Sequence, residues 1–379
     1  MDVMVTSAVP DSPPDAPAAQ LLGWDCIEFW VGNARAFAGF LMSHFGFRCT
    51  AYAGPETGVR DKASYVLEQG DIRFVVSGAL TAESPIAAHV RTHGDGVHDL
   101  AWLVNDAGAA YEAAVARGAT PARAPWTETD DTGVLELAQI KTYGETRHTF
   151  VSRRDYSSPL LEPGYAADNL PPEPAGPAVG LTRIDHVVGN VEKGKLDDWV
   201  RFYSEVIGFS PLVHFDDSQI ATEYSALMST VVWDGTRIYM PLNEPAEGRK
   251  KSQIQEYLET YDGPGVQHIA LRTDDIVATV AALRQRGVRF MQVPDEYYAD
   301  ARRRLAGVDL PWEELQRHNI LVDRDEDGYL LQIFTETVTD RPTVFFEIIE
   351  RHGAKGFGEG NFKALFEAIE RDQARRGNL

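Results

Sequence analysis

Short runs in which apolar and polar residues alternate recur along the first part of the chain. This period of two is typical of strands with a buried face. The strand-like runs of this part are 27–33, 47–53, 63–67, 72–77, 97–102 and 147–151. Residues 37–45 instead repeat their apolar positions at helical spacing, and Gly46 favours the end of that helix. A second helical pattern covers 107–116.

The pattern starts again after residues 157–180, a segment with six prolines that reads as a linker. Stretches before the linker match stretches after it: Ile27–Asn33 with Ile184–Asn190, Gly96–Trp102 with Gly265–Leu271, 117–119 with 286–288, and 147–153 with 341–347. Agreement among separate stretches indicates an internal duplication.

Each half reads strand–helix–strand–strand–strand twice. Such units predict small sheets that pair into two open barrels with helices outside, an α+β fold. The predicted segments are a disordered lead-in at 1–20, rich in Pro, Ala and Asp, a first repeat domain at 21–156, the linker at 157–180, and a second domain at 181–379.

The charge balance limits the partners of this chain. Asp and Glu number 57 against 36 Lys and Arg, a net charge of -21, which disfavours nucleic acids and anionic membranes as partners. The sequence lacks a run of about 18 apolar residues, and its first residues lack the basic and apolar regions of a secretory signal. Cys26 and Cys49 are the only cysteines and form no CxxC pair, so we expect a cytoplasmic protein.

The β-rich run Val344–Ile349 carries a single carboxylate. Glu347 shares one strand face with Phe345 and Ile349, while Phe346 lies on the other face. Burying an ionised carboxylate in such surroundings is costly unless a cation or several donors meet it. Taken alone, the stretch also fits an edge strand with Glu347 in solvent. Its apolar neighbours favour a buried carboxylate with a metal partner.

The duplication allows the two halves to be compared position by position. The matched positions are His186 with Phe29, His268 with Asp99, and Glu347 with Arg153. Two imidazoles and a carboxylate are the ligands of a non-haem iron(II) site with three free positions. The first half lacks such a set, so we expect it to bind no metal and to act as scaffold.

Each histidine also has a plainer interpretation, because a lone strand histidine is more often a core or surface residue than a ligand. Three polar side chains on buried faces at equivalent repeat positions favour the ligand interpretation. The remaining histidines show no such pattern, and most are expected to face solvent: residues 44, 89, 93, 98, 148, 214, 318 and 352. The spacing of His93 and His98 suits neither a helical nor a strand chelate.

Several longer motifs accompany these ligands. They are IDHVVGNV at 184–191, PLNEP at 241–245, KSQIQEYL at 251–258, GVQHIAL at 265–271, GYLLQIFT at 328–335, RPTVFFEIIERHG at 341–353 and GFGEGNFKALFEAIE at 356–370. With them, the chain closely resembles the 4-hydroxyphenylpyruvate dioxygenase family of the vicinal-oxygen-chelate superfamily from about residue 24 to 379. The resemblance is weakest in the loop 298–318.

The resemblance implies an iron(II) cofactor on His186, His268 and Glu347. It implies that the substrates are O2 and an aromatic α-keto acid, 4-hydroxyphenylpyruvate, which chelates the iron through its carboxylate and keto oxygens. Loss of CO2, hydroxylation of the ring and migration of the side chain then give homogentisate, as in tyrosine breakdown. No 2-oxoglutarate is required, because the substrate carries its own keto acid. The family also forms homodimers or homotetramers.

Pocket residues follow from the same motifs. A polar network around the substrate is expected from Ser229, Asn243, Gln253, Gln267 and Gln332, and an aromatic wall from Phe334, Phe345, Phe357 and Phe362. The residues expected to take part in catalysis are Gln267, Gln332, Asn361 and Phe362. Phe345 and Phe357 also fit a plain core role, and Gln253 fits the surface of an amphipathic helix.

The chain from 361 to 376 repeats apolar residues at helical spacing, with Asn361 as the expected N-cap. By itself this is an ordinary packing helix, whereas the resemblance makes it a lid over the iron pocket. The Arg302–Arg304 run lies in the divergent loop and is expected to be a solvated surface without a role.

Three rival functions share this fold. Hydroxymandelate synthase uses the same substrate and ligands but oxidises the benzylic carbon; it tends to have Ile where this chain has Phe362 and Tyr where it has Phe366. The bulky Phe362 therefore favours attack on the ring. A non-catalytic protein that sequesters ligands usually lacks a complete triad, and the QIFT and GFGEGNF motifs speak against an extradiol dioxygenase.

Overall fold

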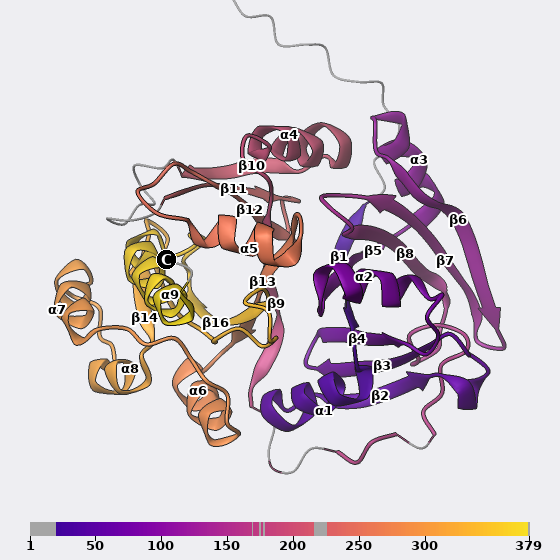
Figure 1. Ribbon diagram of the computed structural model, residues 1–379, viewed down its shortest axis with the longest axis horizontal. Coiled ribbons are helices and arrows are strands. Elements are labelled where there is room, and N and C mark those ends of the chain that lie inside the picture. Colours follow the sequence, from indigo (N-terminus) through magenta and orange to yellow (C-terminus); the bar gives the residue numbers. More distant parts are fainter. Residues whose placement is uncertain (1–19, 169, 174–175, 177–178, 216–225, 378–379) are drawn as a thin grey trace, which may run out of the picture.

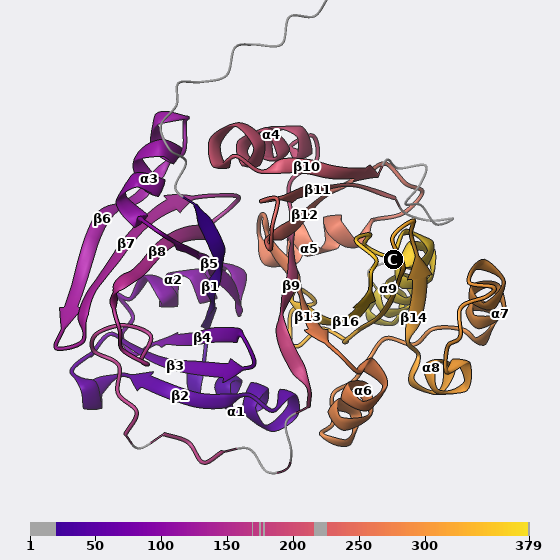
Figure 2. The same cartoon turned by 180° about the vertical axis from the view of Figure 1, so that it is seen from behind.

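The structure is a computed structural model that describes residues 20–168, 170–173, 176, 179–215 and 226–377. The predicted disordered lead-in at 1–20 lies outside these residues, apart from residue 20. Figures 1 and 2 show two curled sheets side by side, one from each half of the chain. The α+β fold of two open, duplicated barrels is confirmed.

The first sheet contains eight strands. In their order of pairing they are β2 (Arg48–Ala53), β3 (Lys62–Gln69), β4 (Ile72–Ala79), β1 (Leu21–Val31), β5 (Gly96–Val104), β8 (Arg147–Tyr156), β7 (Gly133–Lys141) and β6 (Pro121–Asp130). The helices of this half are α1 (Ala34–Phe45), α2 (Pro85–His93) and α3 (Ala107–Ala116).

The second sheet repeats this order with its own eight strands. They are β10 (Ser210–Phe215), β11 (Leu227–Trp233), β12 (Tyr239–Pro245), β9 (Leu181–Asn190), β13 (Gly265–Thr273), β16 (Phe345–His352), β15 (Tyr329–Phe334) and β14 (Leu321–Arg324). Its helices are α4 (Leu196–Arg201), α5 (Gln253–Tyr261), α6 (Ile276–Gln285), α7 (Asp295–Arg304), α8 (Trp312–His318) and α9 (Phe362–Arg376).

Each sheet is built from two strand–helix–strand–strand–strand units that meet at its centre. In the first sheet β1 runs parallel to β4, and β5 runs antiparallel to β1 and parallel to β8. Equivalent capping supports the duplication: Asp106 accepts a hydrogen bond from Ala109 N before α3, and Asp275 accepts one from Ala278 N before α6. The division into domains at 21–156 and 181–379 stays a prediction that these sheets support.

Strand pairing fixes which residues of the two halves are equivalent, and it corrects the sequence alignment. His186 pairs with Ala270 as Cys26 pairs with Ala101, so His186 corresponds to Cys26 rather than to Phe29. His268 corresponds to Asp99, as expected. These strands are buried on both faces, so their sequences do not alternate clearly between apolar and polar residues. A sequence alignment can therefore place them in the wrong register.

The predicted equivalence of Glu347 and Arg153 is also wrong. Phe345 pairs with His268 as Arg147 pairs with Asp99, which makes Thr149 the counterpart of Glu347. By the same count Arg153 is the counterpart of Arg351, four residues further along the strand.

The two halves share one hydrophobic core, in which β16 takes a central place. Phe346 is fully buried on the outer face of β16, opposite to Glu347. Its ring centroid lies 6.5, 5.0 and 6.0 Å from those of Phe29, Phe45 and Phe74 in the first half. The strand that carries Glu347 is therefore held from behind by the first half.

The Pro-rich segment 157–180 contains no helix or named strand in its described residues, but part of it is packed. Leu161 and Tyr165 are buried in the interior of the first curled sheet, and Ala166 pairs with Tyr52. The first part of the linker therefore belongs structurally to the first half.

The stretch 298–318 is not a loop, because most of it forms α7 and α8. Tyr297, Tyr298 and Ala301 bury one face of α7. The expectation that Arg302–Arg304 has no role is wrong for Arg304, whose Nη1 lies 2.7 Å from Asp323 Oδ1. Asp323 in turn accepts a hydrogen bond from Gly360 N, directly before α9.

A buried tyrosine links the halves. Tyr203, in the helical turn Phe202–Ile207 that follows α4, donates to His148 Nε2 at 2.8 Å, while His148 Nδ1 donates to Leu100 O at 3.0 Å. We expect Tyr203→Phe to lower the free energy of unfolding by about 1–3 kcal/mol, because the imidazole acceptor would be buried without a donor. Urea denaturation measures this change.

The matched control is Tyr52→Phe, whose hydroxyl bonds at 2.9 Å to the exposed Glu56. This variant should lose a few tenths of a kcal/mol or less, as is usual for a surface change. Equal losses in the two variants would contradict a specific role for the link between the halves.

Candidate metal centre

Three neighbouring strands of the second sheet bring together the three predicted ligands. His186 lies on β9, His268 on β13 and Glu347 on β16. Ala270 of β13 pairs with both His186 and Glu347, so these side chains project to the same inner face as that of His268. All three side chains are buried, and their ligand atoms lie within 4.8 Å of one another.

The geometry of the cluster suits a metal ion. Glu347 Oε2 lies 3.2 Å from His186 Nε2 and 3.3 Å from His268 Nε2. Atoms that bind one ion at about 2.0–2.2 Å are separated by distances of this order. Two imidazoles and one carboxylate leave further coordination positions open on the cavity side.

The other ring nitrogen of each histidine is held by the residue before it. His186 Nδ1 lies 2.8 Å from Asp185 Oδ1, and His268 Nδ1 lies 3.0 Å from Gln267 Oε1. An acceptor at Nδ1 keeps the proton there and leaves Nε2 free to bind a metal. Both imidazoles are thus oriented as metal ligands.

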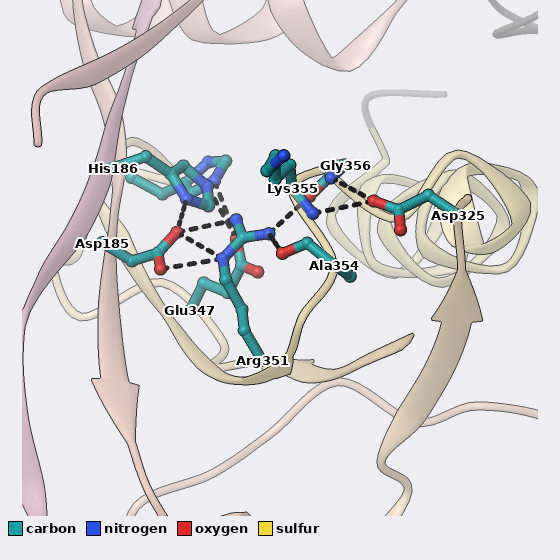
Figure 3. Close-up of polar contacts among 9 residues, drawn as sticks. Asp185, His186, Asp325, Glu347, Arg351, Ala354, Lys355 and Gly356 are labelled. Carbon is teal, nitrogen blue, oxygen red and sulfur yellow. Dashed lines mark hydrogen bonds and ion pairs between the residues drawn. The ribbon is translucent and has the colours of Figure 1, made fainter. Parts of the chain in front are cut away.

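Asp185 is itself held by Arg351, as Figure 3 shows. The guanidinium donates through Nη2 to Oδ1 at 2.7 Å and through Nε to Oδ2 at 2.9 Å, a two-pronged ion pair inside the protein. Arg351 Nη1 also donates to Gly356 O at 2.6 Å. We call the Asp185–Arg351 pair the brace, because it connects a ligand histidine to the segment before α9.

The segment before α9 is held from a second side. Asp325 Oδ2 accepts hydrogen bonds of 2.7 Å from the backbone N–H groups of Lys355 and Gly356 (Figure 3). The side chains of Arg351 and Asp325 therefore fix the path of the chain from β16 toward α9.

Opposing effects set the charge states of the centre. Burial disfavours charge on His186, but the carboxylates of Glu347 and Asp185 outweigh it and raise the pKa of His186 to about 9. Burial likewise opposes ionisation of Asp185, but the charge of Arg351 keeps its pKa well below the usual range. A metal ion therefore has to compete with a proton for His186.

A small cavity opens onto the three ligands, with a volume of about 60 Å³. Of the predicted pocket residues, those that line it are Ser229, Asn243, Gln253, Gln267, Phe334, Phe345, Phe357 and Phe362. Further lining side chains, which the sequence did not single out as pocket residues, are Val188, Phe215, Leu227, Val231, Pro241, Leu365, Phe366 and Ile369. Most of these are apolar residues of ordinary strands and of α9, which carry no distinguishing signal.

Two predicted residues do not line this cavity. Gln332 is buried on β15 beneath Gly358, where a Cβ on that glycine would lie 2.2 Å from Gln332 Nε2. Asn361 Oδ1 accepts a hydrogen bond of 2.5 Å from the hydroxyl of Tyr297, and its side chain does not cap α9. Asn361 makes no cap because its backbone is already helical, at φ -99° and ψ -15°.

The first half has an aspartate–arginine pair equivalent to the brace, but it lacks the three ligands. Arg153 Nε and Nη2 lie 2.5 and 2.9 Å from the two oxygens of Asp25, as Arg351 does with Asp185. Beside this pair stand Cys26, Asp99 and Thr149 in place of the three ligands, and the Thr149 hydroxyl donates to Asp99. Burial raises the pKa of Asp99 to about 7.

The expectation that most other histidines face solvent is wrong for four of the five histidines of the first half. His89, His93, His98 and His148 are all buried. Their burial arises from long-range packing: His93 stacks on Tyr261 of the second half, and His148 on Trp102.

Comparison with known proteins agrees with this geometry. The family model described as Glyoxalase/Bleomycin resistance protein/Dioxygenase superfamily matches residues 183–333. The one described as Hydroxyphenylpyruvate dioxygenase, HPPD, N-terminal, matches residues 16–162.

Curated relatives named 4-hydroxyphenylpyruvate dioxygenase match almost the whole chain. Those from Aspergillus fumigatus, Danio rerio and Dictyostelium discoideum are 44%, 46% and 46% identical; the matches cover 99%, 95% and 94% of this chain and 100%, 93% and 100% of theirs. A solved triple mutant of 4-hydroxymandelate synthase from Streptomyces coelicolor is 36% identical with a TM-score of 0.82, covering 94% of this chain and 100% of its own. The chain belongs to the 4-hydroxyphenylpyruvate dioxygenase family, whose vicinal-oxygen-chelate fold carries a metal cofactor.

Proposed function

We propose that this chain is an iron(II)-dependent dioxygenase that converts 4-hydroxyphenylpyruvate and O2 into homogentisate and CO2. The observation that carries the proposal is the convergence of His186, His268 and Glu347 on a small cavity with several phenylalanines in its lining. Its identity of 44–46% to relatives named for this activity supports the choice of substrate.

Iron(II) fits the residues present. The donor set of two neutral imidazoles and one carboxylate is that of non-haem iron(II) oxygenases. Glu347 is almost completely buried, which is costly for a carboxylate unless a cation meets it. When bound, iron(II) supplies sites for the keto acid and for O2 and activates the oxygen. The protein's own part is to hold the ligands, orient the substrate and exclude water.

Polar side chains of the cavity match the oxygen atoms of an aromatic keto acid. Ser229 and Asn243 face each other across β11 and β12, and Gln253 reaches the same cavity from the first turn of α5. We assign these groups, together with Gln267, to hydrogen bonds with the substrate. The amide of Gln267 also accepts from His268, so substrate binding and ligand orientation meet at one residue.

Aromatic side chains enclose the remainder of the cavity. Phe334 and Phe345 pack against His268, with ring centroids 5.9 and 4.8 Å from the imidazole, and Phe357 lies 5.1 Å from that of His186. Phe362 of α9 closes the opposite side against Phe215 at 5.1 Å. These rings orient the substrate ring and keep water from the reacting atoms.

Helix α9 acts as a lid in this proposal. The cavity of about 60 Å³ is smaller than the roughly 300 Å³ typical of ligand pockets, so the substrate requires α9 to move. A second cavity of about 460 Å³ lies next to the first and shares Gln253, Gln267, Phe345 and Ile369 with it. We assign this second cavity to the route of entry.

Gln332 and Asn361 receive a positioning role rather than contact with substrate. Gln332 supports Gly358 in the segment before α9, and Asn361 fixes the start of α9 through Tyr297. Both therefore act on the closed position of the lid.

The proposal also includes a cytoplasmic location and assembly into a homo-oligomer. Cys26 and Cys49 are free thiols, which supports a reducing cytoplasm. None of the helices in the described residues combines the length and apolar character needed to cross a bilayer. The homodimer or homotetramer stays a prediction.

The direct test is turnover by the iron-loaded enzyme. Protein reconstituted anaerobically with iron(II) and then mixed with 4-hydroxyphenylpyruvate and O2 should yield homogentisate and CO2 in equal amounts, without added 2-oxoglutarate. Chromatography of the products measures both the yield and the position of the new hydroxyl group. Hydroxymandelate as the main product would assign the chain to the alternative reaction, and iron binding without turnover would reject this substrate.

Phe362 tests the choice between the two products. The solved 4-hydroxymandelate synthase neighbour makes benzylic oxidation the specific alternative. Because Phe362 lines the cavity from the lid, Phe362→Ile should free space beside the substrate ring and raise the share of hydroxymandelate several-fold. Ala364→Gly, which weakens α9 at a position outside the cavity lining, is the comparison for general loosening of the lid. An unchanged product ratio in Phe362→Ile would remove this residue from the control of specificity.

A substitution in the brace tests the metal centre itself. Asp185→Asn removes the charge that orients His186 and should weaken iron(II) binding by about 10–100-fold, the usual effect of losing such a partner. Asp25→Asn removes the equivalent carboxylate of the first half, so it should lower stability comparably and leave iron affinity unchanged. Equilibrium dialysis with iron analysis measures both, and equal affinities in the two variants would contradict the role of the brace.

A further inference from the structure

A second cluster of ligand-type side chains lies at the junction of the two halves. His89 and His93 are four residues apart on α2, and Glu145 follows β7 in the turn before β8. Residues four apart share one face of a helix, so both imidazoles point the same way. The ligand atoms of these three residues lie within 4.8 Å of one another.

The distances in this cluster are close to those around Glu347. Glu145 Oε2 lies 3.0 Å from His89 Nδ1 and 3.3 Å from His93 Nε2. The corresponding separations around Glu347 are 3.2 and 3.3 Å. The same chain thus places two imidazole nitrogens around a carboxylate oxygen twice, with similar spacing.

The surroundings of His93 give the strongest support for a metal ion in this cluster. Its Nδ1 lies 2.5 Å from the carbonyl oxygen of Tyr261, which can only accept, so the ring proton resides on Nδ1. Nε2 lies 3.3 Å from Glu145 Oε2 and makes no hydrogen bond with the described residues. A metal ion between these two atoms would be bound by both of them.

The arrangement at His93 is also that of a metal ligand. Ligating imidazoles commonly donate their second ring N–H to a backbone carbonyl, which fixes the tautomer and the ring plane. His93 does so to Tyr261 at the end of α5, and its ring stacks on that of Tyr261 at 4.6 Å. The imidazole is therefore fixed before any ion binds.

The carboxylate of Glu145 accepts a hydrogen bond of 3.0 Å from His89 Nδ1. A metal ion bound at this nitrogen takes the place of the proton, which moves to Nε2 of His89.

The turn that carries Glu145 is anchored in the second half. Gly144 has φ +61°, and a Cβ there would lie 2.4 Å from the carbonyl oxygen of Pro264. Close approach of this glycine to Pro264 fixes the turn against the second half. The side chain of Glu145 is 51% exposed, so an ion between the three groups is reachable from solvent and keeps room for water.

We propose that His89, His93 and Glu145 form a second metal site, which takes a divalent transition metal of the Zn²⁺ class with water as the remaining ligand. Two imidazoles, one carboxylate and a water are an established set for Zn²⁺. This site contradicts the expectation that the first half binds no metal. It is separate from the iron centre and does not depend on the proposed reaction.

The second site ties the two halves together. Its histidines belong to α2 of the first half, and the carbonyl that holds His93 belongs to α5, which also carries Gln253 of the substrate cavity. Next to it, Arg341 donates to Thr92 O at 2.6 Å and to Thr260 O at 3.3 Å, again across the junction. A bound ion would stabilise this junction and hold α5 in place.

Zinc binding by the iron-loaded enzyme tests the proposal. The holoenzyme is dialysed anaerobically against a chelator-buffered Zn²⁺ solution, and iron and zinc are counted per chain by mass spectrometry. One zinc should bind in addition to one iron, with a rise in the thermal midpoint. Zinc that only replaces iron, at a constant total of one metal per chain, would overturn the proposal, as would no bound zinc.

Matched variants separate this site from adventitious binding. Glu145→Gln keeps the size of the side chain and should weaken zinc binding at least tenfold while iron is retained. Glu83→Gln changes an exposed glutamate just before α2 and should leave zinc binding within twofold of the original. Equal zinc affinity in the two variants would place the ion elsewhere. The metal count is independent of turnover, so its failure would leave the proposed function untouched.

Discussion

The burial of one carboxylate organises the second half of this protein. Glu347 is 2% exposed and stands between two imidazoles, a position that is costly without a cation. The charged groups around it are paired with one another: Arg351 neutralises Asp185, and Asp185 orients His186. An apolar side chain in place of Glu347 would pack without such partners. The arrangement is therefore explained by metal binding rather than by stability alone.

The need to hold Glu347 in place also accounts for the hydrophobic core that the two halves share. Glu347 needs a rigid strand, and β16 obtains rigidity because Phe346, on its outer face, packs against three phenylalanines of the first half. The first half thus contributes to the metal centre without touching it. A shift of β16 would move one ligand relative to two others on β9 and β13, and ligand geometry tolerates little movement.

Much of this could be predicted from the sequence, and the failures share a physical cause. The fold class followed from periodicity and duplication. The ligands His186, His268 and Glu347 followed from their apolar strand faces and from the resemblance to the family, whereas the alignment of the halves matched only His268 correctly. The counterparts Cys26 and Thr149 were missed because alternating strands buried on both faces fit several registers. The burial of the first half's histidines was missed because it depends on contacts between distant segments, which local pattern does not contain.

Comparison of the halves separates what the fold requires from what the metal requires. The carboxylate–arginine pair occurs in both halves, as Asp25–Arg153 and Asp185–Arg351, although the residues beside Asp25 and Arg153 do not form a triad. The pair therefore joins β1 to β8 in the first half and β9 to β16 in the second, independently of the residues at the ligand positions. In the second half a histidine follows the aspartate, so the same pair also orients a ligand. The two halves share this charged support, and the ability to bind a metal at this place depends on the side chains at three positions.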